Sequence, residues 1–202
     1  MTGLMHKDYR TIVDSGKLYF IFIIIFALIP GLTNKAFAML FSVMIPITTM
    51  NYDRNCKWDS YAKIALPQSA LTIVGSKYML GYSMIVLTYV LCTLENIFLS
   101  ENAPVVVLLT DFVPLMAMAA IYISIILPIM YMVDSNKGGL IAIVITLGLI
   151  LIIAFKQKAA VNFLLSFSAI HMNMFMALIG TMILMNVLSI ILSANVFKNK
   201  EA

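Results

Sequence analysis

Charged residues are scarce in this sequence, and their scarcity narrows the kind of protein that it can encode. Only 11% of the 202 residues are charged while 62% are hydrophobic, and the mean hydropathy is +1.02. A chain of this length has more apolar surface than one small core can bury, which excludes a soluble domain. The sequence therefore predicts an integral membrane protein.

Clusters of positive charge are missing as well. The formal net charge is +4, but the 13 Lys and Arg residues are scattered between apolar runs. Nucleic-acid binding needs a continuous basic patch, so we expect no nucleic-acid partner. Cysteine is nearly absent too: Cys56 lies in a polar stretch and Cys92 in an apolar one. Two such residues do not indicate a disulfide framework.

Catalytic motifs are also lacking. None of the nine glycines belongs to the phosphate-binding pattern G-x-x-x-x-G-K-[ST], and the apolar runs contain neither paired carboxylates nor H-E-x-x-H. We therefore expect no catalytic residue, no metal site and no cofactor bound by this chain.

Long apolar runs dominate what is present. They predict an all-α integral membrane protein with six transmembrane helices, since a crossing needs about 20 apolar residues. The chain forms a single transmembrane domain over residues 1–202. The expected crossings are about 17–33, 35–51, 77–97, 111–133, 138–156 and 172–197.

The last apolar run is too long for one straight crossing. It extends from Ala159 to Phe197, which as one helix would measure about 58 Å. We expect a break near Ser166 to Asn173, with a re-entrant or amphipathic piece before the last helix. Such a piece needs cover from protein or water.

The distribution of bases predicts the orientation. With the amino terminus in the cytoplasm, ten Lys and Arg residues lie inside, and only Lys35, Lys156 and Lys158 lie outside. Cytoplasmic loops carry the excess of bases, so both termini are expected in the cytoplasm. Glu95 and Asp111 then bracket an outer loop, where we interpret them as solvated acids at the loop edges.

The amino-terminal segment 1–16 predicts an interfacial helix on the cytoplasmic leaflet. A helical projection separates an apolar half from a polar half. The apolar half holds Met1, Leu4, Met5, Tyr9, Ile12 and Val13, and the polar half holds His6, Lys7, Arg10, Thr11 and Asp14.

The polar run at 53–67 predicts a short cytoplasmic helix that ends before Pro67. Trp58, Tyr61, Ala62 and Ala65 share one face of it. An aromatic face of this kind can dock in a groove of another protein. It can equally belong to the aromatic belt at the membrane surface, and the spacing alone leaves both open.

The run "DRNCKWDSYAKIALPQS", together with "SKY" at Ser76 to Tyr78, resembles a pattern in the membrane permeases of bacterial type-two ATP-binding-cassette (ABC) exporters. "LMHKD" near the amino terminus is similar to their Leu-x-x-Lys-Asp opening, although Arg54 stands where the family usually has Glu. The resemblance implies that 53–67 is the coupling helix that docks on a separate ATPase. It assigns Asp53, Lys57, Trp58, Tyr61, Leu66 and Pro67 to coupling, and Leu4, Lys7 and Asp8 to the interfacial helix.

The resemblance implies the permease subunit of an ATP-driven exporter in the bacterial plasma membrane. ATP and Mg²⁺ would be bound by ABC ATPase subunits, and the permease would pair with itself or with a related permease. A hydrophobic or amphipathic peptide, such as a toxin or an antimicrobial peptide, is the expected cargo. The alternative is a membrane adaptor or immunity protein that does not transport and docks a cytoplasmic partner through the same aromatic helix.

Overall fold

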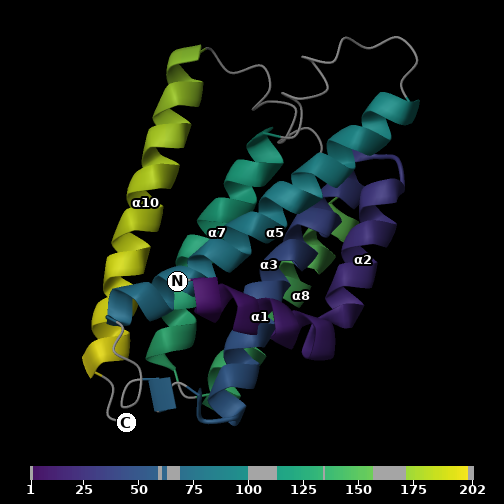
Figure 1. Ribbon diagram of the computed structural model, residues 1–202. Coiled ribbons are helices and arrows are strands. Elements are labelled where there is room, and N and C mark those ends of the chain that lie inside the picture. Colours follow the sequence, from purple (N-terminus) through teal and green to yellow (C-terminus); the bar gives the residue numbers. More distant parts are fainter. Residues whose placement is uncertain are drawn as a thin grey trace.

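The computed structural model describes residues 2–58, 61–62, 69–99, 113–133, 135–156 and 172–199, and within them the secondary structure is entirely helical (Figure 1). This confirms the all-helical prediction for those residues. The helices are α1 (Thr2–Ser15), α2 (Lys17–Leu28), α3 (Leu32–Asn55), α5 (Ala70–Leu99), α7 (Val113–Met132), α8 (Ser135–Phe155) and α10 (Met172–Asn199).

Five of these helices are long and apolar enough to cross a membrane, namely α3, α5, α7, α8 and α10. Helix α2 has only 12 residues, about 18 Å of helix, and meets α1 at an angle of 81°. The number of spans reaches six only if this bent pair counts as one. A multi-pass helical membrane protein is thus confirmed, while six separate crossings remain a prediction.

Helices α3, α5 and α7 form the centre of the bundle, and α2, α8 and α10 pack around them (Figure 1). The core is built from side chains of the central helices such as Val43, Ile47, Val74, Ile123 and Leu127. Helices α8 and α10 instead expose rows of Ile, Leu and Val side chains. Such rows suit contact with lipid.

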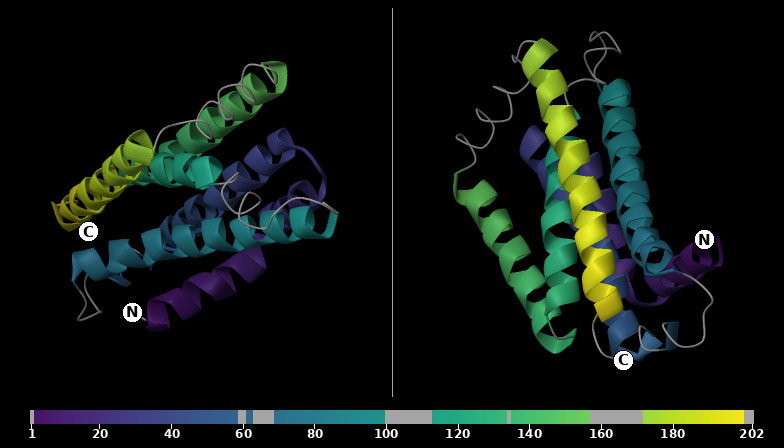
Figure 2. Two further views of the ribbon diagram at one scale, coloured as in Figure 1. Left: turned by 90° about the horizontal axis from the view of Figure 1, so that it is seen from above. Right: turned by 90° about the vertical axis from the view of Figure 1, so that its left-hand side faces the viewer.

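Helix α1 lies across the bundle and packs on α2, α3 and α5; Figure 2 shows it along the outside of α5. Its buried face carries Leu4, Asp8, Thr11 and Ile12. Thr11, which the helical projection assigns to the polar half, is buried, whereas Tyr9 and Val13 of the apolar half are exposed, so the face that packs on the bundle differs from the predicted apolar half. The reason is that α1 turns a mixed face toward charged partners in the bundle.

A tight turn joins α2 to α3. Gly31 has a φ of 115°, in the region that glycine adopts most easily, and Asn34 Nδ2 donates to the Pro30 carbonyl oxygen at 2.8 Å. On the hairpin, the ring of Phe41 stacks on Phe22 and Phe26, at 5.1 Å and 5.6 Å between centroids.

The segment 53–67 is partly described. Helix α3 continues through Asn55, so Asp53 lies in its last turn. A turn at Cys56 and Lys57 follows, in which Lys57 has a φ of 54°, and Trp58, Tyr61 and Ala62 are helical. Leu66 and Pro67 lie outside the described residues. The same is true of most of the stretch 166–173, for which we expect a break, and of Asp111.

Candidate functional site

Four charged side chains from three helices meet at one end of the bundle. Lys7 and Asp8 come from α1, Asp53 from α3 and Lys77 from α5; we call these four residues the ionic cluster. Lys77 Nζ donates to Asp53 Oδ2 at 2.5 Å and to Asp8 Oδ1 at 2.7 Å. Lys7 Nζ donates to Asp53 Oδ2 at 2.6 Å and lies 3.1 Å from Asp8 Oδ1. Each ammonium group therefore contacts both carboxylates.

The ionic cluster is buried and has no net charge. Asp8, Asp53 and Lys77 are exposed by 1%, 2% and 4%, and the side chain of Lys7 by 25%. A buried charge is tolerated only when it is paired and hydrogen-bonded. Removing any one member would leave an uncompensated charge, so the three helices are held in one arrangement.

The aromatic residues of segment 53–67 connect the ionic cluster to the surface. Lys7 Nζ lies 4.6 Å from the centroid of the Trp58 ring, within range of a cation–π interaction. The Trp58 ring lies 5.4 Å from that of Tyr61, which is 57% exposed. A continuous row of contacts thus runs from exposed Tyr61 through Trp58 to Lys7 and Asp53.

Arg54 ties α3 to the end of α7. Its guanidinium group donates to the carbonyl oxygens of Met130 and, at 3.2 Å, Val133, and lies 5.9 Å from the centroid of the Tyr131 ring. The last carbonyls of a helix lack partners within the helix and favour a cation. The arginine that departs from the family pattern thus caps α7.

The structure places the sequence-predicted residues in two groups. Lys7, Asp8, Asp53 and Trp58 come together, with Leu4 buried on the same helix α1. Lys57 and Tyr61 lie at the surface. Asp53 is buried in the ionic cluster, beneath this surface.

Sequence reasoning missed Lys77 as a site residue, although it belongs to the quoted "SKY" run. The signal was available, since a lone lysine within an apolar helix needs a buried partner. A polar ladder was missed too: the Tyr78 hydroxyl on α5 hydrogen-bonds with Ser189 Oγ at 2.6 Å and Ser193 Oγ at 3.0 Å on α10. One turn further along, Tyr82 donates to Asn186.

The interpretation of Glu95 as a solvated acid was wrong. Glu95 is only 6% exposed and forms an ion pair with Lys35, which is 1% exposed. The cause is the α2–α3 hairpin, which packs against α5 and covers both side chains. The interior therefore contains more charge than the apolar runs indicated.

The family model for ABC-2 family transporter protein matches residues 3–198. The chain belongs to this family, and it is accordingly a membrane-spanning permease component of a transporter. No curated protein and no solved structure matches it.

Proposed function

We propose that this chain is the permease subunit of an ATP-driven exporter of hydrophobic or amphipathic peptides. It would act with separate ABC ATPase subunits, which bind ATP and Mg²⁺, and it would pair with itself or with a related permease. The observation that carries this proposal is the row of contacts from Tyr61 through Trp58 to the ionic cluster.

The row of contacts would transmit a displacement of segment 53–67 to α1, α3 and α5. An ATPase docked on segment 53–67, including Leu66 and Pro67, would move Tyr61 and Trp58. Trp58 packs on Lys7, so the displacement reaches α1, and Asp53 and Lys77 pass it to α3 and α5. Because the ionic cluster resists separation, the three helices would move as one unit.

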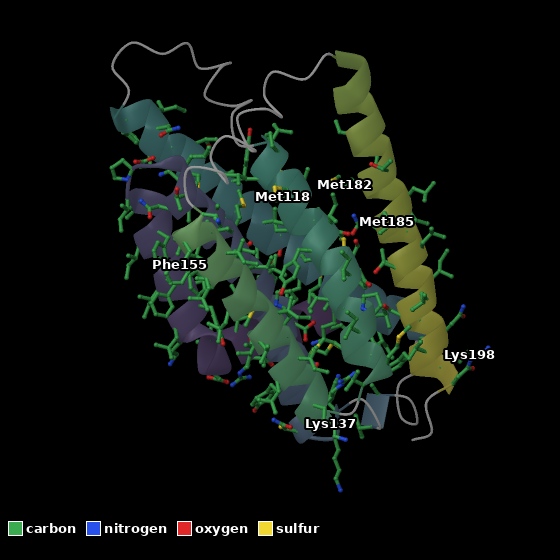
Figure 3. All side chains as sticks on the ribbon, turned by 180° about the vertical axis from the view of Figure 1, so that it is seen from behind. Met118, Lys137, Phe155, Met182, Met185 and Lys198 are labelled. Carbon is green, nitrogen blue, oxygen red and sulfur yellow. The ribbon has the colours of Figure 1, made fainter. Side chains whose placement is uncertain are left out.

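Basic residues support an orientation with both termini in the cytoplasm of a bacterial cell. Figure 3 shows Lys137 and Lys198 at the same end of the bundle. Arg54, at the end of α3, contacts the end of α7 that immediately precedes α8, which places it at that end too. Bases concentrate on the cytoplasmic side of membrane proteins.

The character of the described surface supports the proposed cargo class. The charged groups of the ionic cluster and of the Lys35–Glu95 pair are occupied with one another. Methionine is available instead: Met118 of α7 and Met185 of α10 are 45% and 44% exposed, and Figure 3 shows them on these neighbouring helices. Methionine adapts to varied apolar partners. The size of the chain suits the permease that exports phenol-soluble modulins, peptides of this class, in Gram-positive bacteria.

Co-purification with the candidate ATPase tests the proposal. The variant Trp58→Ala/Tyr61→Ala in nanodiscs should lose the ATPase subunit or the permease-dependent control of its ATP hydrolysis. Tyr52→Ala is the matched control, because Tyr52 is also an exposed aromatic residue, 43% exposed, near the end of α3.

Two results would overturn the coupling role. If the double variant pairs and hydrolyses ATP like the wild type, the two aromatic residues belong to a membrane-surface belt. If the wild-type chain binds a cytoplasmic partner but never alters an ATPase, the adaptor alternative takes the place of the exporter.

A further inference from the structure

A second buried charge site lies at the opposite ends of the same two helices, α3 and α5. Lys35, in the first turn of α3, pairs with Glu95, near the end of α5. Lys35 Nζ also donates to the Ala27 carbonyl oxygen, in the last turn of α2, at 2.5 Å. One ammonium group therefore holds together α2, α3 and α5. We call Lys35 and Glu95 the distal pair.

The distal pair repeats the Lys77–Asp53 contact with the charges exchanged. At one end α3 supplies the acid, Asp53, and α5 the base, Lys77; at the other end α3 supplies the base and α5 the acid. Lys35 and Asp53 are eighteen residues apart, and so are Lys77 and Glu95. The two antiparallel helices are thus fastened at both ends in a single register.

Stability alone does not account for the distal pair. A buried ion pair contributes no more than well-packed apolar residues of similar volume, because both ions lose their hydration. In addition, Glu95 Oε1 is buried and has no hydrogen-bond partner among the described residues, and neither side chain of the distal pair is more than 4% exposed. Asp8 Oδ2 in the ionic cluster is also unsatisfied, but that cluster reaches the surface through Lys7, whose side chain is 25% exposed. Buried carboxylate oxygens are expected to have a partner, so the enclosed oxygen of Glu95 requires an explanation. Exposure to water would satisfy that oxygen.

We propose that the distal pair is a gate, whose separation opens the end of the bundle remote from the ionic cluster during transport. When the α2–α3 hairpin moves away from α5, Lys35 and Glu95 gain water and Lys35 releases the Ala27 carbonyl. When the hairpin returns, the cost of burying either charge alone ensures that the two close together. The gate rests on the proposed transport function, whereas the ion pair between Lys35 and Glu95 does not depend on it.

The two native cysteines provide the test. Cys92 is fully buried on α5, three residues before Glu95, while Cys56 is exposed. In a Cys56→Ser background, a membrane-impermeant maleimide therefore reports the opening of the distal end through the labelling of Cys92. The experiment uses the permease with its ATPase in nanodiscs, with and without ATP.

We expect Cys92 to be labelled about tenfold faster during ATP turnover, which corresponds to about 1.4 kcal/mol in the opening equilibrium. Glu95→Gln should accelerate labelling without ATP, and the exchange Lys35→Glu/Glu95→Lys should restore slow labelling. Ala142→Cys is the control for general loosening: Ala142 is fully buried on α8, away from the distal pair, and its label should stay slow throughout.

Unchanged labelling of Cys92 in the Cys56→Ser protein during active ATP hydrolysis would overturn the gate. So would equal acceleration at Cys92 and at the Ala142→Cys position, since that reports loss of the fold. The Glu95→Gln comparison needs no ATPase. A failure of ATPase coupling, which concerns the proposed function, is therefore distinguishable from a failure of the gate.

Discussion

The carboxylate of Asp53 lies 2.5 Å from the ammonium group of Lys77, and both side chains are buried. These two residues come from the two runs that carry the family resemblance within 53–78, and α1 adds the third run, at residues 4–8. Three short stretches of sequence thus converge on one charge-balanced site. This explains why a chain with so few charged residues keeps charges at these positions.

Asp53→Asn should destabilise the protein strongly, because Lys7 and Lys77 would then share a single carboxylate. Removing one partner of a buried ion pair costs about 3–5 kcal/mol. Thermal unfolding in detergent measures the loss. Lys7→Gln/Asp8→Asn is the matched control, since it keeps the site neutral and retains the Asp53–Lys77 bond, and its loss should be smaller. Equal losses would contradict the importance of charge balance.

Arg54→Glu introduces the residue type that is usual in the family and should lower the thermal midpoint. A carboxylate would face the terminal carbonyls of α7, where a cation is favoured. The lost charged hydrogen bonds correspond to about 2 kcal/mol. Arg54→Lys keeps the charge but loses the branched guanidinium group. Its thermal midpoint should therefore lie between those of the wild type and Arg54→Glu. An Arg54→Glu protein as stable as the wild type would refute the capping role.

Gly139→Ala should be destabilising and Gly148→Ala should not, although both glycines belong to α8. A Cβ at Gly139 would lie 2.6 Å from Asn51 Nδ2 and 3.0 Å from its Cγ, whereas a Cβ at Gly148 would meet nothing within 4 Å. We expect a cost of about 1–3 kcal/mol at the first position from overpacking. At the second, alanine favours the helix by up to about 1 kcal/mol. Matched denaturation curves of the two variants decide between them.

Tyr78→Phe and Ser189→Ala should each weaken the attachment of α10 to α5, and their effects should not add. The two hydroxyls share one hydrogen bond of 2.6 Å, but Tyr78 also bonds with Ser193 and Ser189 also donates to the Ser124 carbonyl oxygen. The loss in the double variant should therefore fall short of the sum by the shared bond only. Each single change should cost about 1 kcal/mol. Tyr9→Phe, which removes only an exposed contact of 3.1 Å with Ser83, is the control. Fully additive losses would show that the two hydroxyls act independently.

The helical membrane architecture could be predicted because apolar length alone specifies it. A break between the first two apolar helices was predicted at residue 34, but it lies earlier, between Leu28 and Leu32, because the local signal there is Pro30-Gly31. The residues of segment 53–67 were found by resemblance. The contact between this segment and α1 was not predicted, because Lys7 and Asp53 are 46 residues apart and no local pattern joins them.

The buried ion pairs were missed for a different reason. Glu95 was interpreted as a solvated acid at a loop edge, and Lys35 was counted as a base of an outer loop, so neither was considered as a buried partner. Their spacing contained the contrary signal: equal intervals of eighteen residues with reversed signs match two antiparallel helices. For an isolated charge near the end of an apolar helix, a partner of opposite charge on another helix should therefore be sought before the charge is assigned to solvent.

The distance between the two charge sites along α3 and α5 matches the thickness of the bilayer. Eighteen residues of helix span about 27 Å, close to the hydrocarbon thickness of a typical membrane. In a thicker bilayer, the hydrophobic mismatch would leave Lys35 and Glu95 among acyl chains when they separate, where unpaired charges are costly. For the gate proposed at the distal pair, longer lipid tails would then slow the labelling of Cys92 without altering a single residue.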